Sequence, residues 1–317
     1  MATTEQSRRR IRGLDGLRAI AALIVLGYHL LPTYVSVGFV GVDVFFVLSG
    51  FLITALFLRE RQKFGKVAIG AFWMRRIRRL LPAVVVATFG SIALASIVRG
   101  DAIVQLPWQA FGSLTGTYNW LEIVKGSSYF ESQSPLLLTN MWSLAVEQQF
   151  YIVWPVVLLL ILAYVPRRFA PIVTAAIALA SAGEHALLVS GGADITRAYV
   201  GTDTHSFGLM IGATLAFLFP RAMDGSARVL RGARARLWSV AAWVALVGVL
   251  IIGIAVPYGP LMYPWGMVAV SLLTAVVIRG LLPDINEAPT RLMANILEWR
   301  PIKWMGERSY GIYLWHW

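Results

Sequence analysis

An arginine and a histidine lie in one apolar segment near the start of the chain, with ten residues between them, in LDGLRAIAALIVLGYHLLP. Eleven helical steps bring Arg18 and His29 onto the same face of a helix, about 16 Å apart along its axis. Ionisable groups inside a membrane-spanning segment are costly and usually serve a function. The spacing therefore predicts a permanent cation near one membrane surface and a titratable imidazole near the other.

Two carboxylates are expected at the depth of His29. Asp43 lies near the start of the next apolar segment, GFVGVDVFFVLSGFLIT, and Glu147 lies near the start of a later one, NMWSLAVEQQFYIVWP. A carboxylate beside an imidazole fixes its tautomer and raises its basicity, as general-base catalysis needs. The residues alone leave two other interpretations open, which are a helix–helix hydrogen bond for Asp43 and an interfacial acid facing water for Glu147.

Four arginines in AFWMRRIRRLLP precede the third apolar segment. Arg76 and Arg79 are three residues apart and are therefore neighbours on a helix surface. Two guanidinium groups at this spacing suit a phosphate or pyrophosphate. Arg75 and Arg78 share the spacing, and from the spacing alone orientation of the chain by positive charge is the better explanation of all four residues.

The elements that must position these residues are membrane-spanning helices. The chain has 317 residues, of which 58% are hydrophobic and 14% charged, with a mean hydropathy of +0.68. This composition predicts an all-α, polytopic membrane bundle formed by one domain, residues 1–317. The predicted spans are 17–34, 38–58, 81–98, 143–165, 170–190, 203–220, 238–256 and 262–279, and a ninth begins near 306.

The distribution of positive charge predicts the orientation. With the N-terminus in the cytoplasm, and with 108–124 dipping into the membrane without crossing it, the inner segments hold all but three of the 28 Lys and Arg residues. The exceptions are Arg99, Lys125 and Arg197. The net charge of +12 is then mostly a matter of topology, and nucleic-acid binding is not expected.

The composition also limits the chemistry. The chain has no cysteine, which excludes disulfides, cysteine-ligated metals and a thiol nucleophile. Its four histidines do not show the HExxH spacing, and we predict no metal site.

Six motifs in order resemble the acyltransferase family 3 group of bacterial membrane proteins. They are LDGLR with Arg18-x10-His29, GFVGVDVFFVLSGFLIT, FWMRRIRRLLP, WSLAVEQQFYIVWP, YVGTDTHSFGLMIGATLA and SYGIYLWHW. The resemblance implies transfer of an acyl group, usually acetyl, from cytoplasmic acyl-CoA to a hydroxyl of an extracytoplasmic carbohydrate such as peptidoglycan. It places the protein in the bacterial cytoplasmic membrane.

The resemblance also implies roles for individual residues. His29 and Glu147 correspond to functional residues of the family, and Arg18 pairs with His29 as an essential residue. The family's RxxR pair matches Arg76 and Arg79 best, because they precede Leu-Pro; Arg75 and Arg78 are the other match. We expect acyl-CoA, most simply acetyl-CoA, to be held by Arg18, Arg76, Arg79 and Arg75, and the catalytic group to consist of His29, Glu147 and Asp43.

The chain departs from the family in three places. Gln148 replaces a common glutamate, His205 replaces a common arginine, and eight spans with part of a ninth replace the usual ten. We therefore expect the chain to be truncated at its C-terminus. A transporter of a small acid or a lipid-linked sugar is the competing function, since charges on one helical face also suit a proton relay.

Overall fold

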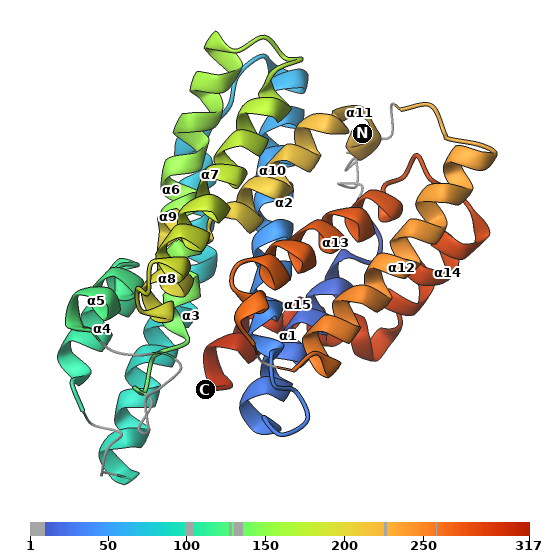
Figure 1. Cartoon of the computed structure of the whole chain (residues 1–317). Coiled ribbons are helices and arrows are strands. Elements are labelled where there is room, and N and C mark those ends of the chain that lie inside the picture. Colours follow the sequence, from blue (N-terminus) through green and yellow to red (C-terminus); the bar gives the residue numbers. More distant parts are fainter. Residues whose placement is uncertain (1–9, 99–103, 127–128, 130–135, 225–226, 258) are drawn as a thin grey trace, which may run out of the picture.

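The computed structural model describes residues 10–98, 104–126, 129, 136–224, 227–257 and 259–317, and it is α-helical (Figure 1). Five of the described helical segments are long and apolar enough to cross a bilayer, and two shorter apolar helices accompany them. The predicted all-α, multi-pass architecture is therefore confirmed. The five long segments are Gly38–Phe64, Ile69–Val98, Met141–Tyr164, Ala170–Ser190 and Ala233–Ala255.

Every predicted spanning segment overlaps a helix of the structure, and α7 has the predicted bounds, 170–190. The helices are α1 (Leu14–Leu30), η1 (Gly38–Val40), α2 (Gly41–Phe64), α3 (Ile69–Val98), α4 (Leu106–Thr115), α5 (Tyr118–Lys125), α6 (Met141–Tyr164), α7 (Ala170–Ser190), α8 (Ile195–Val200), α9 (Thr202–His205), α10 (Phe207–Leu218), α11 (Pro220–Asp224), α12 (Ala233–Ala255), η3 (Pro260–Met262), α13 (Trp265–Leu281), α14 (Ala288–Leu297) and α15 (Arg300–Trp315).

The segment predicted to dip into the membrane forms two short helices, α4 and α5. Gly116, with a φ of 69°, adopts the left-handed conformation that ends α4 and lets the chain turn before α5. The two helices have 10 and 8 residues, so each is too short to cross a bilayer. Both pack against α6, and α4 also packs against α3.

The centre of the bundle is α2, which packs against α1, α6, α10 and α13. Its contact with α10 is a backbone crossing. A Cβ atom on Gly50 would overlap the carbonyl oxygen of Leu209, and one on Gly212 would overlap that of Val47. The crossing explains why small residues are needed at both positions. Helix α2 thereby becomes the fixed element against which the other helices are placed.

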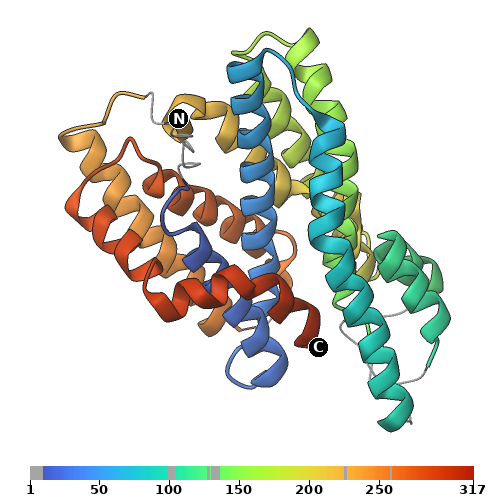
Figure 2. The ribbon, with the colours of Figure 1, turned by 180° about the vertical axis from the view of Figure 1, so that it is seen from behind.

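The connections of the bundle lie at opposite ends. The α2–α3 link and the α6–α7 link lie together at the upper end in Figures 1 and 2, and the loop between α1 and η1 lies at the lower end. We call the upper end the basic end, because Arg61, Lys63, Arg167 and Arg168 lie there. Of the three positive residues predicted on the other side, Arg99 lies outside the described residues.

One arginine that we counted among the basic inner segments has a different role. Arg279, at the last turn of α13, is only 2% exposed and forms two hydrogen bonds of 2.8 and 2.9 Å with the carboxylate of Asp284. Its guanidinium lies 4.3 Å from the ring centre of Phe219 and 5.1 Å from that of Trp238. Arg279 therefore joins α10, α12 and α13 as a buried ion pair and is not a loop charge.

Candidate active site

A pocket of about 80 Å³ lies between α1, α2, α3, α6 and α15. Four of the residues singled out in the sequence line it, and they come from three separate helices: Arg18, Arg76, Arg79 and Glu147. We call this space the arginine pocket. The structure therefore brings together residues that are up to 129 positions apart in the sequence.

Packing against aromatic rings holds Arg76 in place. Its guanidinium lies 5.4 Å from the ring centre of Phe72, one turn earlier on α3, and 5.0 Å from that of Tyr151 on α6. Arg75 and Arg78 are exposed and do not line the pocket. Of the two RxxR pairs in the sequence, Arg76 and Arg79 are therefore the pair that faces the pocket.

Glu147 does not lie beside His29, as its position along the chain suggested, because it lines a pocket that His29 does not line. It lines the arginine pocket, interacts electrostatically with Arg18 and Arg79, and accepts a hydrogen bond from Ser49 on α2. Arginine side chains are long, so the guanidinium groups of Arg18 and Arg79 can interact with Glu147 from other helices.

The arginine pocket carries more positive than negative charge. Glu147 faces three guanidinium groups, and Asp15, one turn before Arg18, accepts a hydrogen bond of 3.3 Å from Arg18. Asp15 also pairs with Arg10, which bonds Glu307 at 3.2 Å. Arg10 therefore takes up part of the negative charge of Asp15 and Glu307. A pocket of this composition is suited to an anion with several oxygens, such as a phosphate ester.

His29 lies outside the lining of the arginine pocket and is part of an aromatic group. Its ring centre is 4.8 Å from that of Tyr28, 5.0 Å from that of His316 and 4.6 Å from that of Trp317. The side chain is half-buried, and no hydrogen bond to its ring is recorded among the described residues. We call His29, Tyr28, His316 and Trp317 the histidine cluster.

Asp43 does not meet His29. It is fully buried on α2, and its Oδ1 lies 3.1 Å from Nε2 of His205. Nδ1 of His205 donates to the carbonyl oxygen of Tyr199 at 2.5 Å, so the second bond requires a proton shared between Nε2 and Asp43. The pair is neutral as a whole, which lowers the cost of its burial. Asp43 faces His205 at the end of α9, whereas His29 at the end of α1 faces His316 and Trp317, which follow α15, and this orientation separates them.

Tyr313 connects the arginine pocket with the histidine cluster. It lines the pocket, and its ring centre is 4.9 Å from that of His316. Its hydroxyl is 2.6 Å from Oγ of Ser143 and donates to the carbonyl oxygen of Asn140 at 3.2 Å. One tyrosine side chain on α15 therefore separates the arginine pocket from the group that contains His29.

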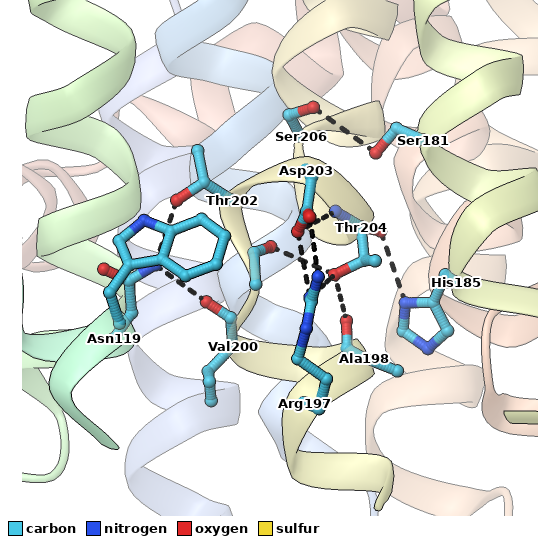
Figure 3. A network of polar contacts seen from close by, with 12 residues as sticks. Asn119, Ser181, His185, Arg197, Ala198, Val200, Thr202, Asp203, Thr204 and Ser206 are labelled. Carbon is cyan, nitrogen blue, oxygen red and sulfur yellow. Dashed lines mark hydrogen bonds and ion pairs between the residues drawn. The ribbon is translucent and has the colours of Figure 1, made fainter. Parts of the chain in front are cut away.

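A second polar network attaches the α4–α5 pair to the bundle (Figure 3). Asn119 on α5 donates to the carbonyl oxygen of Val200 at 3.0 Å and to the hydroxyl of Thr202 at 2.9 Å. Beside it, Arg197 forms two bonds of 2.9 and 2.6 Å with Asp203. These contacts fix the α8–α9 segment, and with it the backbone that carries His205.

Sequence reasoning assigned no role to several residues of the site. Asp15, Ser49, Tyr151 and Tyr313 lie in apolar segments, where a single polar or aromatic side chain gives no sign of a shared pocket. His316 was recognised only as part of a family motif. A usable signal existed for Asp15, because an acid three residues before an arginine is a common helical pair.

Glu122 on α5 gives a testable pH dependence. It is 1% exposed, and burial, with Asp194 nearby, raises its pKa from 4.5 to about 8. The folded protein therefore holds a proton that the unfolded chain loses above pH 4.5, so stability falls as the pH rises from 4.5 to 8. The slope from this group is about 1.4 kcal/mol per pH unit. Compared with wild type, Glu122→Gln should lose less thermal stability in detergent between pH 6 and pH 8. Equal pH slopes would contradict this assignment.

Comparison with known proteins gives consistent matches over the whole chain. A family model described as an acyltransferase domain matches residues 11–317. The putative peptidoglycan O-acetyltransferase YrhL of Bacillus subtilis (strain 168) is 39% identical over 322 residues, covering 98% of this chain and 49% of that protein. The peptidoglycan O-acetyltransferase OatA of Listeria monocytogenes is 37% identical over 318 residues, covering 99% of this chain and 50% of that protein.

A putative O-acetyltransferase of Staphylococcus aureus (strain COL) is 34% identical over 317 residues, covering 99% of this chain and 51% of that protein. No solved structure matches the chain. The chain spans about half the length of the curated relatives that it matches.

Proposed function

The chain belongs to the acyltransferase 3 family, and we propose that it transfers an acetyl group from acetyl-CoA to a hydroxyl group of peptidoglycan. The observation that supports this most strongly is the arginine pocket, which lies one tyrosine away from the histidine cluster. The names of the relatives suggest the acceptor. In this proposal the basic end lies in the cytoplasm and the histidine cluster lies near the outer surface. The chain then has the eight membrane spans, and the start of a ninth, that the sequence predicts.

The arginine pocket is the proposed donor site. Arg76, Arg79 and Arg18 would hold the phosphates of acetyl-CoA at the cytoplasmic surface, with the pantetheine arm directed toward Tyr313. Arg18 and His29 are about 16 Å apart along α1. An extended pantetheine arm has a length of the same order. Arg75, which is exposed, would serve only orientation.

His29 is the proposed general base. It would remove the proton from the acceptor hydroxyl as that oxygen forms a bond to the acetyl carbonyl carbon. The carbon–sulfur bond to CoA then breaks, and the proton passes from His29 to the departing thiolate. The products are the O-acetyl ester and free CoA, so the atoms and charges balance without a further reactant.

The carboxylates have supporting roles in this proposal. Glu147, held by Ser49, would balance the charge of the arginines when no donor is bound and would space their guanidinium groups. Asp43 would hold His205 and thereby fix α2 against α9. We therefore do not retain the initial expectation that Asp43 acts on the substrate.

Inverted membrane vesicles provide the test, because they expose the proposed donor side to the medium. Vesicles containing the protein and a soluble muropeptide-type glycan in the lumen are supplied with acetyl-CoA labelled in the acetyl group. We expect labelled ester in the lumen and free thiol outside, and neither product in vesicles with Arg18→Ala. Uptake of a small acid without release of thiol would identify a transporter and reject the proposal.

A further inference from the structure

His316 lies beside the proposed base, and none of the roles assigned so far includes it. Its ring centre is 5.0 Å from that of His29 and the two planes are tilted by 52°. At this separation of the ring centres, rotation of the rings can bring one nitrogen of each within hydrogen-bond distance. Asp43 and Glu147, the two acids expected beside His29, are engaged elsewhere. The group that orients the His29 ring must therefore come from another residue.

The hydrogen bonds of His316 define its tautomer. Nδ1 lies 2.6 Å from the carbonyl oxygen of Tyr313. A carbonyl oxygen only accepts, so Nδ1 carries the hydrogen, and Nε2 of the neutral ring carries a lone pair. Nε2 is buried and has no hydrogen-bond partner among the described residues. His316 therefore offers a hydrogen-bond acceptor that is shielded from water and lies next to His29.

The backbone that carries His316 is held in place. The side-chain amide of Asn140, at the start of α6, donates to the carbonyl oxygens of Tyr313 at 2.9 Å and Leu314 at 3.4 Å. These carbonyl groups belong to the last turn of α15, where a helix leaves its acceptors without internal partners. Asn140 therefore fixes the end of α15 at the level of the histidine cluster.

We propose that His316 is the positioning residue of His29: Nε2 of His316 accepts a hydrogen bond from one ring nitrogen of His29 and leaves the other nitrogen as the base. A third group that orients the base is the usual arrangement in acid–base catalysis, and here a neutral imidazole takes the place of a carboxylate. This inference rests on the proposed function of His29.

Two substitutions test the two ring nitrogens of His316 independently: Nε2, the proposed acceptor, and Nδ1, which bonds the carbonyl oxygen of Tyr313. His316→Asn keeps a donor at the position of Nδ1 and so retains the bond to Tyr313, but it removes the acceptor at Nε2. His316→Gln places an amide oxygen near the position of Nε2 and gives up the donor. If His316 has only a structural role, the asparagine variant should be the more active of the two. Our proposal predicts that the glutamine variant is the more active one.

We expect His316→Asn to lower kcat by about tenfold or more, with KM for acetyl-CoA unchanged, and His316→Gln to retain several times more activity than His316→Asn. Nitrogen-15 NMR of labelled histidine provides a readout that is independent of turnover. The His29 ring should show one tautomer in wild type and in His316→Gln, and a mixture of two in His316→Asn.

Equal kcat values in the two variants, or an unchanged His29 tautomer in His316→Asn, would overturn the proposal. Absence of acetyl transfer by the wild-type protein, together with the expected NMR change, would instead reject the proposed function and leave the His29–His316 contact standing. The two failures are therefore distinguishable.

Discussion

Replacing His29 by alanine should reduce acetyl transfer by about 10²–10⁴-fold, the usual contribution of a positioned general base. Binding of acetyl-CoA should remain close to wild type, because His29 does not line the arginine pocket. The measurement is the rate of labelled ester formation in inverted vesicles, together with the dissociation constant of acetyl-CoA in detergent.

Tyr34 offers a matched control for the His29 variant. It lies in the loop that follows α1, is 76% exposed, and belongs to neither the histidine cluster nor the arginine pocket. Tyr34→Ala should therefore leave the rate unchanged. Near-normal turnover by His29→Ala would refute the assignment of the base, and a large loss of acetyl-CoA binding would place His29 in the donor site instead.

Replacing Arg76 by alanine should weaken acetyl-CoA binding by about 10- to 100-fold, which corresponds to a charged hydrogen bond of about 1.5–3 kcal/mol. The effect should appear in KM for acetyl-CoA more than in kcat, since the guanidinium is expected to contact the donor's phosphates and not the reacting carbon. Calorimetry and initial rates measure the two quantities.

Arg75→Ala is the control for Arg76→Ala, because it removes the same charge from the adjacent position. Arg75 is exposed and does not line the arginine pocket. Its loss should therefore change KM for acetyl-CoA by less than about threefold, since exposed charges contribute little to an interaction at a distance. Equal effects of the two substitutions would mean that the net charge of the basic end, and not the pocket, attracts the donor.

The sequence alone predicted the helices well because the signal for them is local. A run of apolar residues of membrane-spanning length identifies each segment independently of the rest, which is why α7 has the bounds expected for it. Which helices approach each other closely, in contrast, shows only in the structure, where Gly50 faces the backbone of α10 and Gly41 lies against the backbone of α1.

The partners of the site residues could not be predicted in the same way. The depth of a residue follows from its position in the helix, but the neighbour that it faces depends on the rotation and tilt of that helix against the others. Asp43 was placed at a plausible depth and still faces His205. Glu147 shows the same limit, since it lines the arginine pocket with Arg18 and Arg79, and His29 does not.

The crossing of α1 and α15 determines when the arginine pocket can form during synthesis of the chain. A Cβ atom on Gly306 would overlap the backbone of Asp15, so the two helices touch at their main chains and α15 forms one wall of the arginine pocket. At a usual rate of about 5–20 residues per second, the ribosome completes α15 roughly 15–60 s after α1. A nascent chain therefore carries Arg18 into the membrane long before α15 can complete the wall of the arginine pocket.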